Sequence, residues 1–107
     1  MEWERKLREE GFIEVGDFRI ELTLDNTFLD LDYIPRVIVY DEETSCWHVL
    51  RNPIPKGKSL KEGWDNAVKV LEAIARGDAD PVLGDDEVGE RLQKALRELY
   101  KNGQTTP

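Results

Sequence analysis

The chain has 107 residues, of which 39 % are hydrophobic and 36 % charged, enough for one globular domain with its own core. Its net charge of −8 comes from 23 acidic and 15 basic residues. That balance argues against nucleic acid or an anionic membrane as the main binding partner. The single cysteine excludes an internal disulfide and gives no zinc-ligand spacing. We therefore expect a cytoplasmic protein that needs no metal or cofactor.

The first segment, residues 2–10, predicts a short helix. Trp3 and Leu7 share one helical face, and Gly11 supplies a C-terminal stop. The same stretch lacks the apolar run of a signal peptide, and no later segment has the length and apolarity that predict a membrane span.

Residues 12–50 predict four or five short strands that follow one another as an antiparallel meander. Gly16 and Asp17 form a turn between two apolar runs. The strand after it has one buried and one wet face, because Phe18, Ile20, Leu22 and Leu24 alternate with polar residues. We expect a turn over 25–27, a strand over 28–33 that Pro35 interrupts, a central strand over 36–40, and a last strand beginning at Cys46.

Two longer helices are predicted after the strands. Ser59 and Glu62 form a capping box at the start of the first, and Gly77 ends it. Its apolar stripe is Leu60, Trp64, Ala67, Val68, Leu71, Ile74 and Ala75. The stripe of the last helix is Val88, Leu92, Ala95, Leu96 and Leu99, and Gly103 is its expected end. We predict one α+β domain over residues 1–102, with two or three helices packed on the sheet, and a flexible tail over 103–107.

Cys46 and His48 are the only cysteine and histidine, and they lie two positions apart on a predicted strand. Residues at this spacing share a face about 7 Å apart, whereas activation of a thiolate needs contact with its base and a third group to orient the imidazole. We interpret the pair as ordinary strand residues and predict no catalytic site here.

Asn52 to Ser59 lie between a strand and a helix and end in Gly-Lys-Ser, as a phosphate-binding loop does. The first glycine of that motif is missing, and Pro53 and Pro55 remove amide donors, so the sequence does not predict a nucleotide site. Lys56, Lys58 and Lys61 still gather at a helix start, where they form a candidate anion-binding site or a solvated basic loop.

Acidic residues suggest two further sites. Asp25, Asn26, Asp30 and Asp32 lack the glycine and glutamate of a calcium-binding loop, so we predict no metal site there. Between Gly77 and Glu90 the chain has no basic residue and five acids: Asp78, Asp80, Asp85, Asp86 and Glu87. Helix capping requires only part of this charge. We predict either a solvated connector or a surface that binds a basic partner.

From Val37 to Ile74, the order of strand, acidic turn, CWHV, short loop and capped helix resembles the N-terminal domain of HicB-type antitoxins. The matching positions are Gly57, Ser59, Leu60, Glu62, Asn66 and Ala67. The family's Pro-Gly-Cys-like turn and a DNA-reading motif are absent, and extra strands precede the match. The resemblance implies a protein-binding, antitoxin-like fold without its DNA-binding half, and it brings no catalytic residue.

Two functions remain open from the sequence. The first is a small acidic protein that inhibits or regulates a basic partner, such as a nuclease or another nucleic-acid-binding enzyme, in the manner of an antitoxin or a phage-encoded inhibitor of host defence. The alternative is a small ligand-binding or enzymatic domain with a pocket between the sheet and the helices. The first reading predicts contact with protein and not with nucleic acid or membrane, and it leaves a homodimer open.

Overall fold

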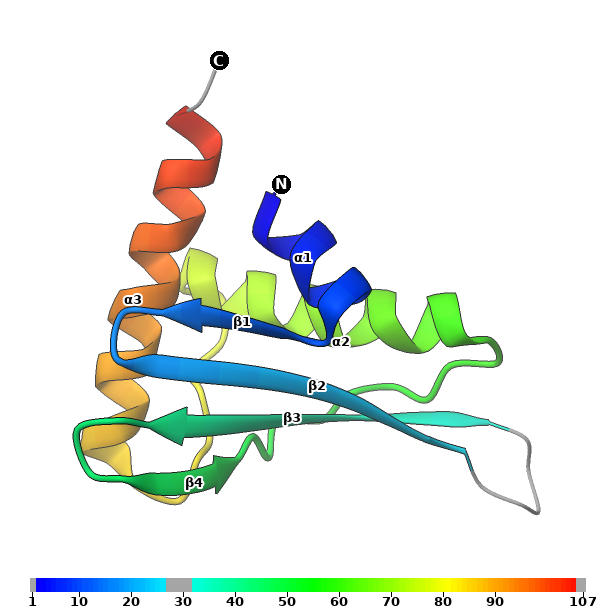
Figure 1. Ribbon diagram of the computed structural model, residues 1–107, viewed down its shortest axis with the longest axis horizontal. Coiled ribbons are helices and arrows are strands. Elements are labelled where there is room, and N and C mark those ends of the chain that lie inside the picture. Colours follow the sequence, from blue (N-terminus) through cyan, green and yellow to red (C-terminus); the bar gives the residue numbers. More distant parts are fainter. Residues whose placement is uncertain (1, 27–31, 106–107) are drawn as a thin grey trace.

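The computed structural model describes residues 2–26 and 32–105. The elements follow the order α1 (Glu2–Glu10), β1 (Phe12–Val15), β2 (Phe18–Asn26), β3 (Tyr33–Asp41), β4 (Cys46–Val49), α2 (Leu60–Arg76) and α3 (Asp86–Thr105). The strands form one antiparallel sheet in the order β1-β2-β3-β4, and the three helices accompany it (Figure 1). The predicted α+β meander is confirmed.

Strand register divides the sheet into an inner face against the helices and an outer face. Ile13, Ile20, Val39 and His48 are neighbours across the four strands, and the first three are buried. The inner face packs against the apolar faces of the helices; the helical members of this core are Trp3, Leu7, Ala67, Val68, Leu71, Ile74, Ala75, Val88, Leu92 and Leu96. The sheet therefore has helices on one face only, which leaves the other face for solvent or a partner.

The boundaries of β2 and β3 differ from the prediction. Asp25 and Asn26 belong to β2 and pair with β3, so the turn does not begin at residue 25, and Pro35 lies inside β3 opposite Leu24. Alternate residues of a strand direct their N–H groups to opposite sides. The backbone nitrogen of Pro35 faces away from β2, so the proline removes no hydrogen bond between β2 and β3. Strand β4 ends at Val49, opposite Ile38, and so does not reach Pro35. The remainder of the expected strand, residues 28–31, lies outside the described residues.

Helix α2 begins as predicted. The Ser59 hydroxyl accepts a hydrogen bond from the backbone N–H of Glu62 at 3.1 Å, and Gly77 ends the helix with a φ of 86°. The stripe differs at its start: Leu60, the first residue of α2, is 55 % exposed. Gly103 does not end α3, which continues to Thr105. A glycine inside a helix costs only about 1 kcal/mol, and nothing compels the chain to turn there.

The beginning of α1 and the end of α3 lie on the same side of the molecule, and β4 lies on the opposite side (Figure 1). Helix α1 packs on β1 and β2, and helix α2 packs on β2, β3 and α3.

Candidate functional site

The segment from Asp78 to Glu87, here called the acidic connector, joins α2 to α3. All five of its acids are exposed. Asp78 accepts a hydrogen bond from the Arg76 guanidinium at 3.1 Å. Asp85 caps α3, because its carboxylate accepts hydrogen bonds from the backbone N–H groups of Glu87 and Val88 at 3.1 and 3.2 Å. Asp80 and Asp86 make no comparable side-chain hydrogen bond within the described part of the chain, whereas Glu87 interacts electrostatically with Arg91.

A polar hollow of about 310 Å³ opens beside the connector and the first turns of α3. It is lined by Asp80, Pro81, Asp86, Gly89, Glu90 and Gln93. Glu90 was not among the predicted acids, although it lies one helical turn after Asp86 and the spacing would have revealed it. Within residues 2–26 and 32–105, no cluster of three or more metal-ligating side chains is present. The hollow presents three exposed carboxylates, those of Asp80, Asp86 and Glu90.

Hydrogen bonds fasten the acidic connector to the chain just after β4. The backbone N–H of Arg51 donates to the Val82 carbonyl at 2.8 Å. The Asn52 side chain donates to the Asp80 carbonyl at 2.9 Å and accepts from the Val82 N–H at 2.8 Å. These contacts place the predicted acids next to the edge of the sheet, a neighbourhood that the sequence pattern did not reveal.

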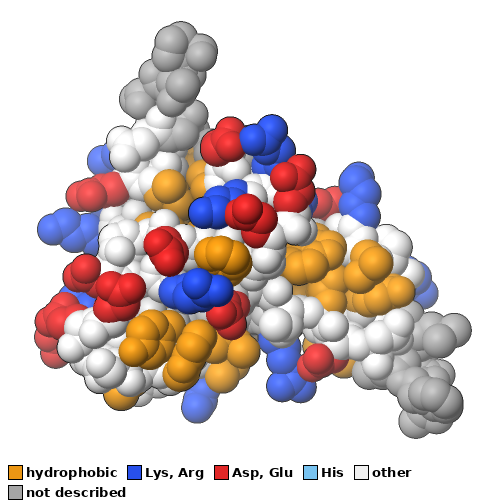
Figure 2. Space-filling model, in the orientation of Figure 1, with side chains coloured by type: hydrophobic (Ala, Val, Ile, Leu, Met, Phe, Trp, Pro, Cys, Tyr) orange, Lys and Arg blue, Asp and Glu red, His pale blue; other side chains and the backbone are white. Residues whose placement is uncertain are grey.

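The outer face of β3 and β4 carries an apolar patch made of Ile38, Tyr40, Trp47 and Val49. Register places Val49 opposite Ile38 and Trp47 opposite Tyr40, and the two rings lie with their centroids 4.9 Å apart. Trp47 is 54 % exposed and Val49 52 %. Figure 2 shows hydrophobic side chains gathered over this part of the sheet. Large exposed apolar side chains that adjoin one another are typical of a protein-binding surface.

The β1–β2 half of the outer face is different, because its charges are already paired. Arg19 lies 2.9 Å from the Glu21 carboxylate and 4.0 Å from that of Glu14. Its guanidinium also lies over the Phe12 ring, 3.9 Å from the centroid. The apolar patch is thus bounded on one side by paired charges, and on the other by the open edge of β4.

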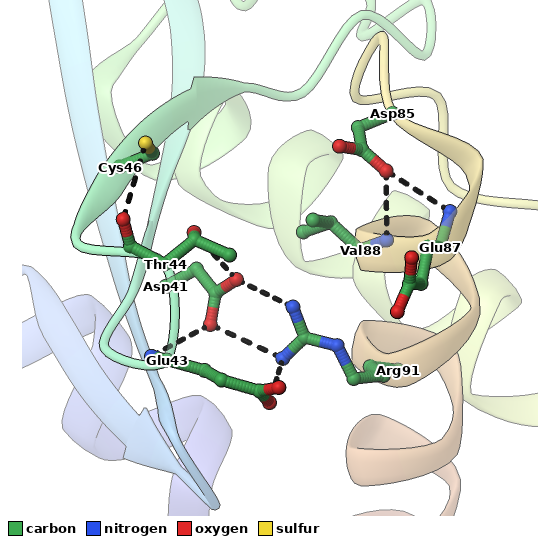
Figure 3. Close-up of polar contacts among 8 residues, drawn as sticks. All are labelled: Asp41, Glu43, Thr44, Cys46, Asp85, Glu87, Val88 and Arg91. Atoms are coloured by element: carbon green, nitrogen blue, oxygen red, sulfur yellow. Dashed lines mark hydrogen bonds and ion pairs between the residues drawn. The ribbon is translucent and has the colours of Figure 1, made fainter.

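A buried ion pair holds α3 against the end of β3 (Figure 3). The Arg91 guanidinium donates to both carboxylate oxygens of Asp41, at 3.2 and 2.5 Å, and Asp41 is fully buried. The hydrogen bonds from Arg91 hold the pKa of Asp41 below its usual value, against the opposing effect of burial. Glu43 approaches the same guanidinium at 3.0 Å. Sequence reasoning missed this pair, since Asp41 begins an acidic turn that is otherwise exposed.

Cys46 and His48 both point to the inner side of β4, as the alternation predicts. The Cys46 thiol is exposed and donates to the Thr44 carbonyl at 3.4 Å. His48 is partly buried, and its Nε2 has no hydrogen-bond partner in the described part of the protein. No hydrogen bond joins the two side chains within the same residues. That the two residues form no catalytic site remains a prediction.

The loop that carries Lys56 and Lys58 makes hydrogen bonds that stabilise its own conformation. The Gly57 N–H donates to the Tyr33 carbonyl at 2.9 Å, so it is not directed at an anion. A Cβ at Gly57 would lie 2.2 Å from the backbone nitrogen of Gly63, so only glycine fits against the first turn of α2. Lys61 lies 3.8 Å from Asp65. The Asn66 side chain donates to the carbonyls of Pro55 and Lys56 at 3.1 and 3.3 Å. These contacts give structural roles to Gly57 and Asn66.

The carboxylates of the calcium-like stretch do not form a described metal site. Asp25 pairs with Arg36 at 2.7 Å on the outer face, and Asp30 lies outside the described residues.

A carboxyl pair links α1 to α2. Burial, followed by hydrogen bonding with Glu72, raises the pKa of Glu4 to about 7. Nearby, Arg8 lies 2.9 Å from Asp65 and ties the same two helices together. The carboxyl pair and the Arg8–Asp65 ion pair both join α1 to α2, so we expect them to affect stability.

A second concavity, of about 320 Å³, lies between α1, β1 and α3. Trp3, Ile13 and Leu99 form its apolar wall, and Lys6 and Asn102 are among its polar groups. The alternative function requires a ligand pocket between the sheet and the helices. This concavity is the candidate for that pocket, and it lies at the β1 edge of the sheet.

Comparison with known proteins does not assign a family: no family model, no curated protein and no solved structure matches the chain. Among the described helices, none has the length and apolar character needed to cross a membrane.

Proposed function

We propose that this chain is a binding protein that inhibits or regulates a basic protein partner, with the apolar patch and the acidic connector as its docking surface. The observation that carries the proposal is the exposure of Trp47 and Val49, 54 % and 52 %, on a strand whose end is fastened to the connector. Exposed aromatic side chains supply binding energy, and unpaired charges nearby supply orientation and association rate.

The charge of this surface selects the class of partner. The connector has no basic residue, and the hollow beside it is lined by Asp80, Asp86 and Glu90. A nucleic-acid-handling enzyme such as a nuclease presents a positive groove that this surface would complement. An antitoxin or a phage-encoded inhibitor of host defence would act in this way, by occupying the groove in place of nucleic acid.

A bait experiment tests the proposal. The tagged chain is compared with a patch variant, Trp47→Thr with Val49→Thr, which removes apolar surface and uses a β-branched residue that favours strands at both positions. From its native lysate the wild-type chain should recover a basic protein in stoichiometric amount, and the patch variant should recover much less. The exposed residue Leu60, replaced by Thr on α2, serves as the matched control and should leave recovery unchanged. Equal losses in the two variants, or recovery of no basic protein, would refute the proposal.

The concavity of about 320 Å³ supports a second candidate, a ligand-binding domain. Its wall of Trp3, Ile13 and Leu99 suits a small apolar ligand. A screen of apolar compounds by thermal shift tests it: a ligand that raises the melting temperature of the wild-type chain but not of a Leu99→Asn variant would favour this function.

A further inference from the structure

Strand β4 is one of the two edges of the sheet, and its outward backbone groups are open. In an antiparallel pair, alternate residues direct their N–H and C=O groups toward the partner strand and away from it. Leu50 donates its N–H to the Val37 carbonyl at 2.9 Å, so the backbone N–H and C=O groups of residues 46, 48 and 50 are directed at β3. The backbone N–H and C=O groups of Trp47 and Val49 therefore point away from β3, toward the open edge of the sheet.

The next outward residue shows that this edge accepts a hydrogen-bonding partner. Arg51 follows the same alternation, and its N–H donates to the Val82 carbonyl at 2.8 Å. The acidic connector thus occupies the outward position at Arg51 and leaves the two before it free. No backbone hydrogen bond from another described segment reaches Trp47 or Val49.

The open stretch is short and has defined ends. At one end, the Val82 carbonyl already accepts the outward N–H of Arg51. At the other end, Ser45 has a φ of 57°, which takes the chain out of the extended conformation. Between these ends β4 has no proline, no lysine and no bulge, the devices by which proteins usually protect an edge. The exposed side chains of Trp47 and Val49 would contact a strand added here on its outer side.

Charge decides between a second copy of this chain and a basic partner. The acidic turn, with Glu42 and Glu43 exposed, lies at the Cys46 end of β4, and the acidic connector lies at the Arg51 end. If β4 paired antiparallel with β4 of a second copy, the turn of each copy would meet the connector of the other. Each end of the contact would then gather the glutamates of one turn and the connector acids of the other copy against the single exposed Arg51, so like charge would predominate there. A segment with basic residues at its ends has the opposite property.

We propose that β4 accepts an extended segment of the basic partner as a fifth strand, bonded to the backbone of Trp47 and Val49. The segment is apolar in the middle, where it lies beside these two side chains, and carries Lys or Arg at both ends. This mode of recognition is known as strand addition. The inference rests on the proposed function, because it specifies how the basic partner is bound.

Peptides test the added strand directly. The probe is a blocked peptide of about ten residues with alternating valine and threonine in the middle and lysines at both ends, a length that spans β4 and the acids beside it. Its control carries glutamates in place of lysines. Two further probes are N-methylated, one at every valine and the other at every threonine. Because only one set of amides faces β4, one N-methylated series should lose binding at least about tenfold and the other should retain it.

Nuclear magnetic resonance of the labelled chain supplies the matching readout. The amide signals of Trp47 and Val49 should shift and gain protection from exchange, while that of His48, already bonded to β3, should keep its protection. Val49→Pro removes an outward N–H that the sheet does not use, whereas Val49→Thr keeps it. With the fold of both variants verified from their spectra, Val49→Pro should bind the lysine-ended peptide about tenfold more weakly than Val49→Thr.

Each outcome bears on one of the two proposals. Equal binding of both N-methylated series, or absence of peptide binding, would refute the added strand, and the bait experiment alone would then decide the proposed function. If lysine-ended and glutamate-ended peptides bound equally, the edge would still be a strand acceptor, but the preference for a basic partner would fail. A dimer in sedimentation that Val49→Pro abolishes would assign the edge to a second copy and overturn the inference.

Discussion

Asp41 and Arg91 lie 50 residues apart in the sequence, and two hydrogen bonds join their side chains at the junction of β3 and α3. Asp41 also accepts hydrogen bonds from the Thr44 hydroxyl at 2.8 Å and the Glu43 N–H at 3.1 Å. One carboxylate therefore fixes the turn before β4 and the helix behind it. The β3–β4 turn and α3 should consequently become disordered together if this contact is lost.

Arg91→Met should be strongly destabilising, because it leaves the buried Asp41 carboxylate without its cation. We expect the melting temperature to fall by roughly 10 °C, since the loss of one partner of a buried pair is among the largest effects of a single substitution. Glu43→Gln is the control: its carboxylate also contacts Arg91 but is 60 % exposed, and it should change the melting temperature little. Equal effects of both variants in thermal denaturation would contradict a structural role for the Asp41–Arg91 pair.

The same pair predicts a stability loss in acid. The folded-state pKa of Asp41 is lowered, so its contribution is fully present above the unfolded value of about 3.9 and is lost as the pH falls through the folded value. Denaturant titrations between pH 6 and pH 2 should show stability declining below about pH 4. In Arg91→Met this decline should be smaller. An identical decline in both proteins would show that other carboxylates cause it.

Glu4→Gln should stabilise the protein at alkaline pH. The pKa of Glu4 is raised to about 7 in the folded state, so folding disfavours its ionised form. The resulting loss of stability begins above the unfolded value of about 4.5 and is complete above pH 7. We expect the variant to melt a few degrees higher than wild type at pH 8.5 and at the same temperature at pH 4.5. The groups that face Glu4 are Glu72, which raises its pKa, and Arg8 and the N-terminal amine, which lower it. A gain that does not vary with pH would exclude the ionisation of Glu4 as its cause.

Helix α2 allows a matched test of the core, since two leucines of the same predicted stripe differ in burial. Leu71 is 0 % exposed and Leu60 is 55 % exposed. Leu71→Ala should lower the free energy of unfolding by about 2–5 kcal/mol, through lost burial and the cavity left behind. Leu60→Ala should change it by less than about 0.5 kcal/mol. Chemical denaturation measures both, and similar costs would mean that the first turn of α2 is covered in solution.

Reversing the charge of the acidic hollow should slow association with the recovered basic partner. The variant replaces Asp80, Asp86 and Glu90 by Lys and leaves the capping residue Asp85 in place. Its control replaces Glu9, Glu10 and Glu98, which are exposed on other surfaces. Each reversal adds two charges, so both variants have a net charge of −2 instead of −8.

Stopped-flow measurements at two salt concentrations distinguish the variants. The hollow variant should associate at least about tenfold more slowly at low salt, and salt should affect its rate less than that of the wild type. The control variant should retain most of the wild-type rate. Equal slowing would show that net charge alone matters and that the connector is a solvated segment.

The features that the sequence predicted are those encoded by neighbouring residues. Strand alternation, the Ser59 cap and the Gly77 stop depend on contacts within a few positions, and the structure confirms them. The position of Pro35 inside β3 was not predictable in this way, since it depends on which neighbour each N–H faces.

The candidate docking surface was predictable only in part. Its acids are visible as a run without basic residues, and the structure shows them exposed. The exposure of Trp47 was not predictable, because a tryptophan in an alternating strand is usually buried and the sequence does not say which face the helices cover. Asp41 was missed for the opposite reason, since a charged residue at a turn is usually solvated.

Both ends of the described chain lie on the side of the molecule away from β4, which has a practical consequence for working with this protein (Figure 1). A fluorescent fusion or a biotin attached before α1 or after α3 would be held at a distance from the apolar patch. Immobilised through either end, the protein would present the β4 edge outward to the solution. Sensor surfaces prepared in the two orientations should therefore report the same affinity for a ligand of that edge.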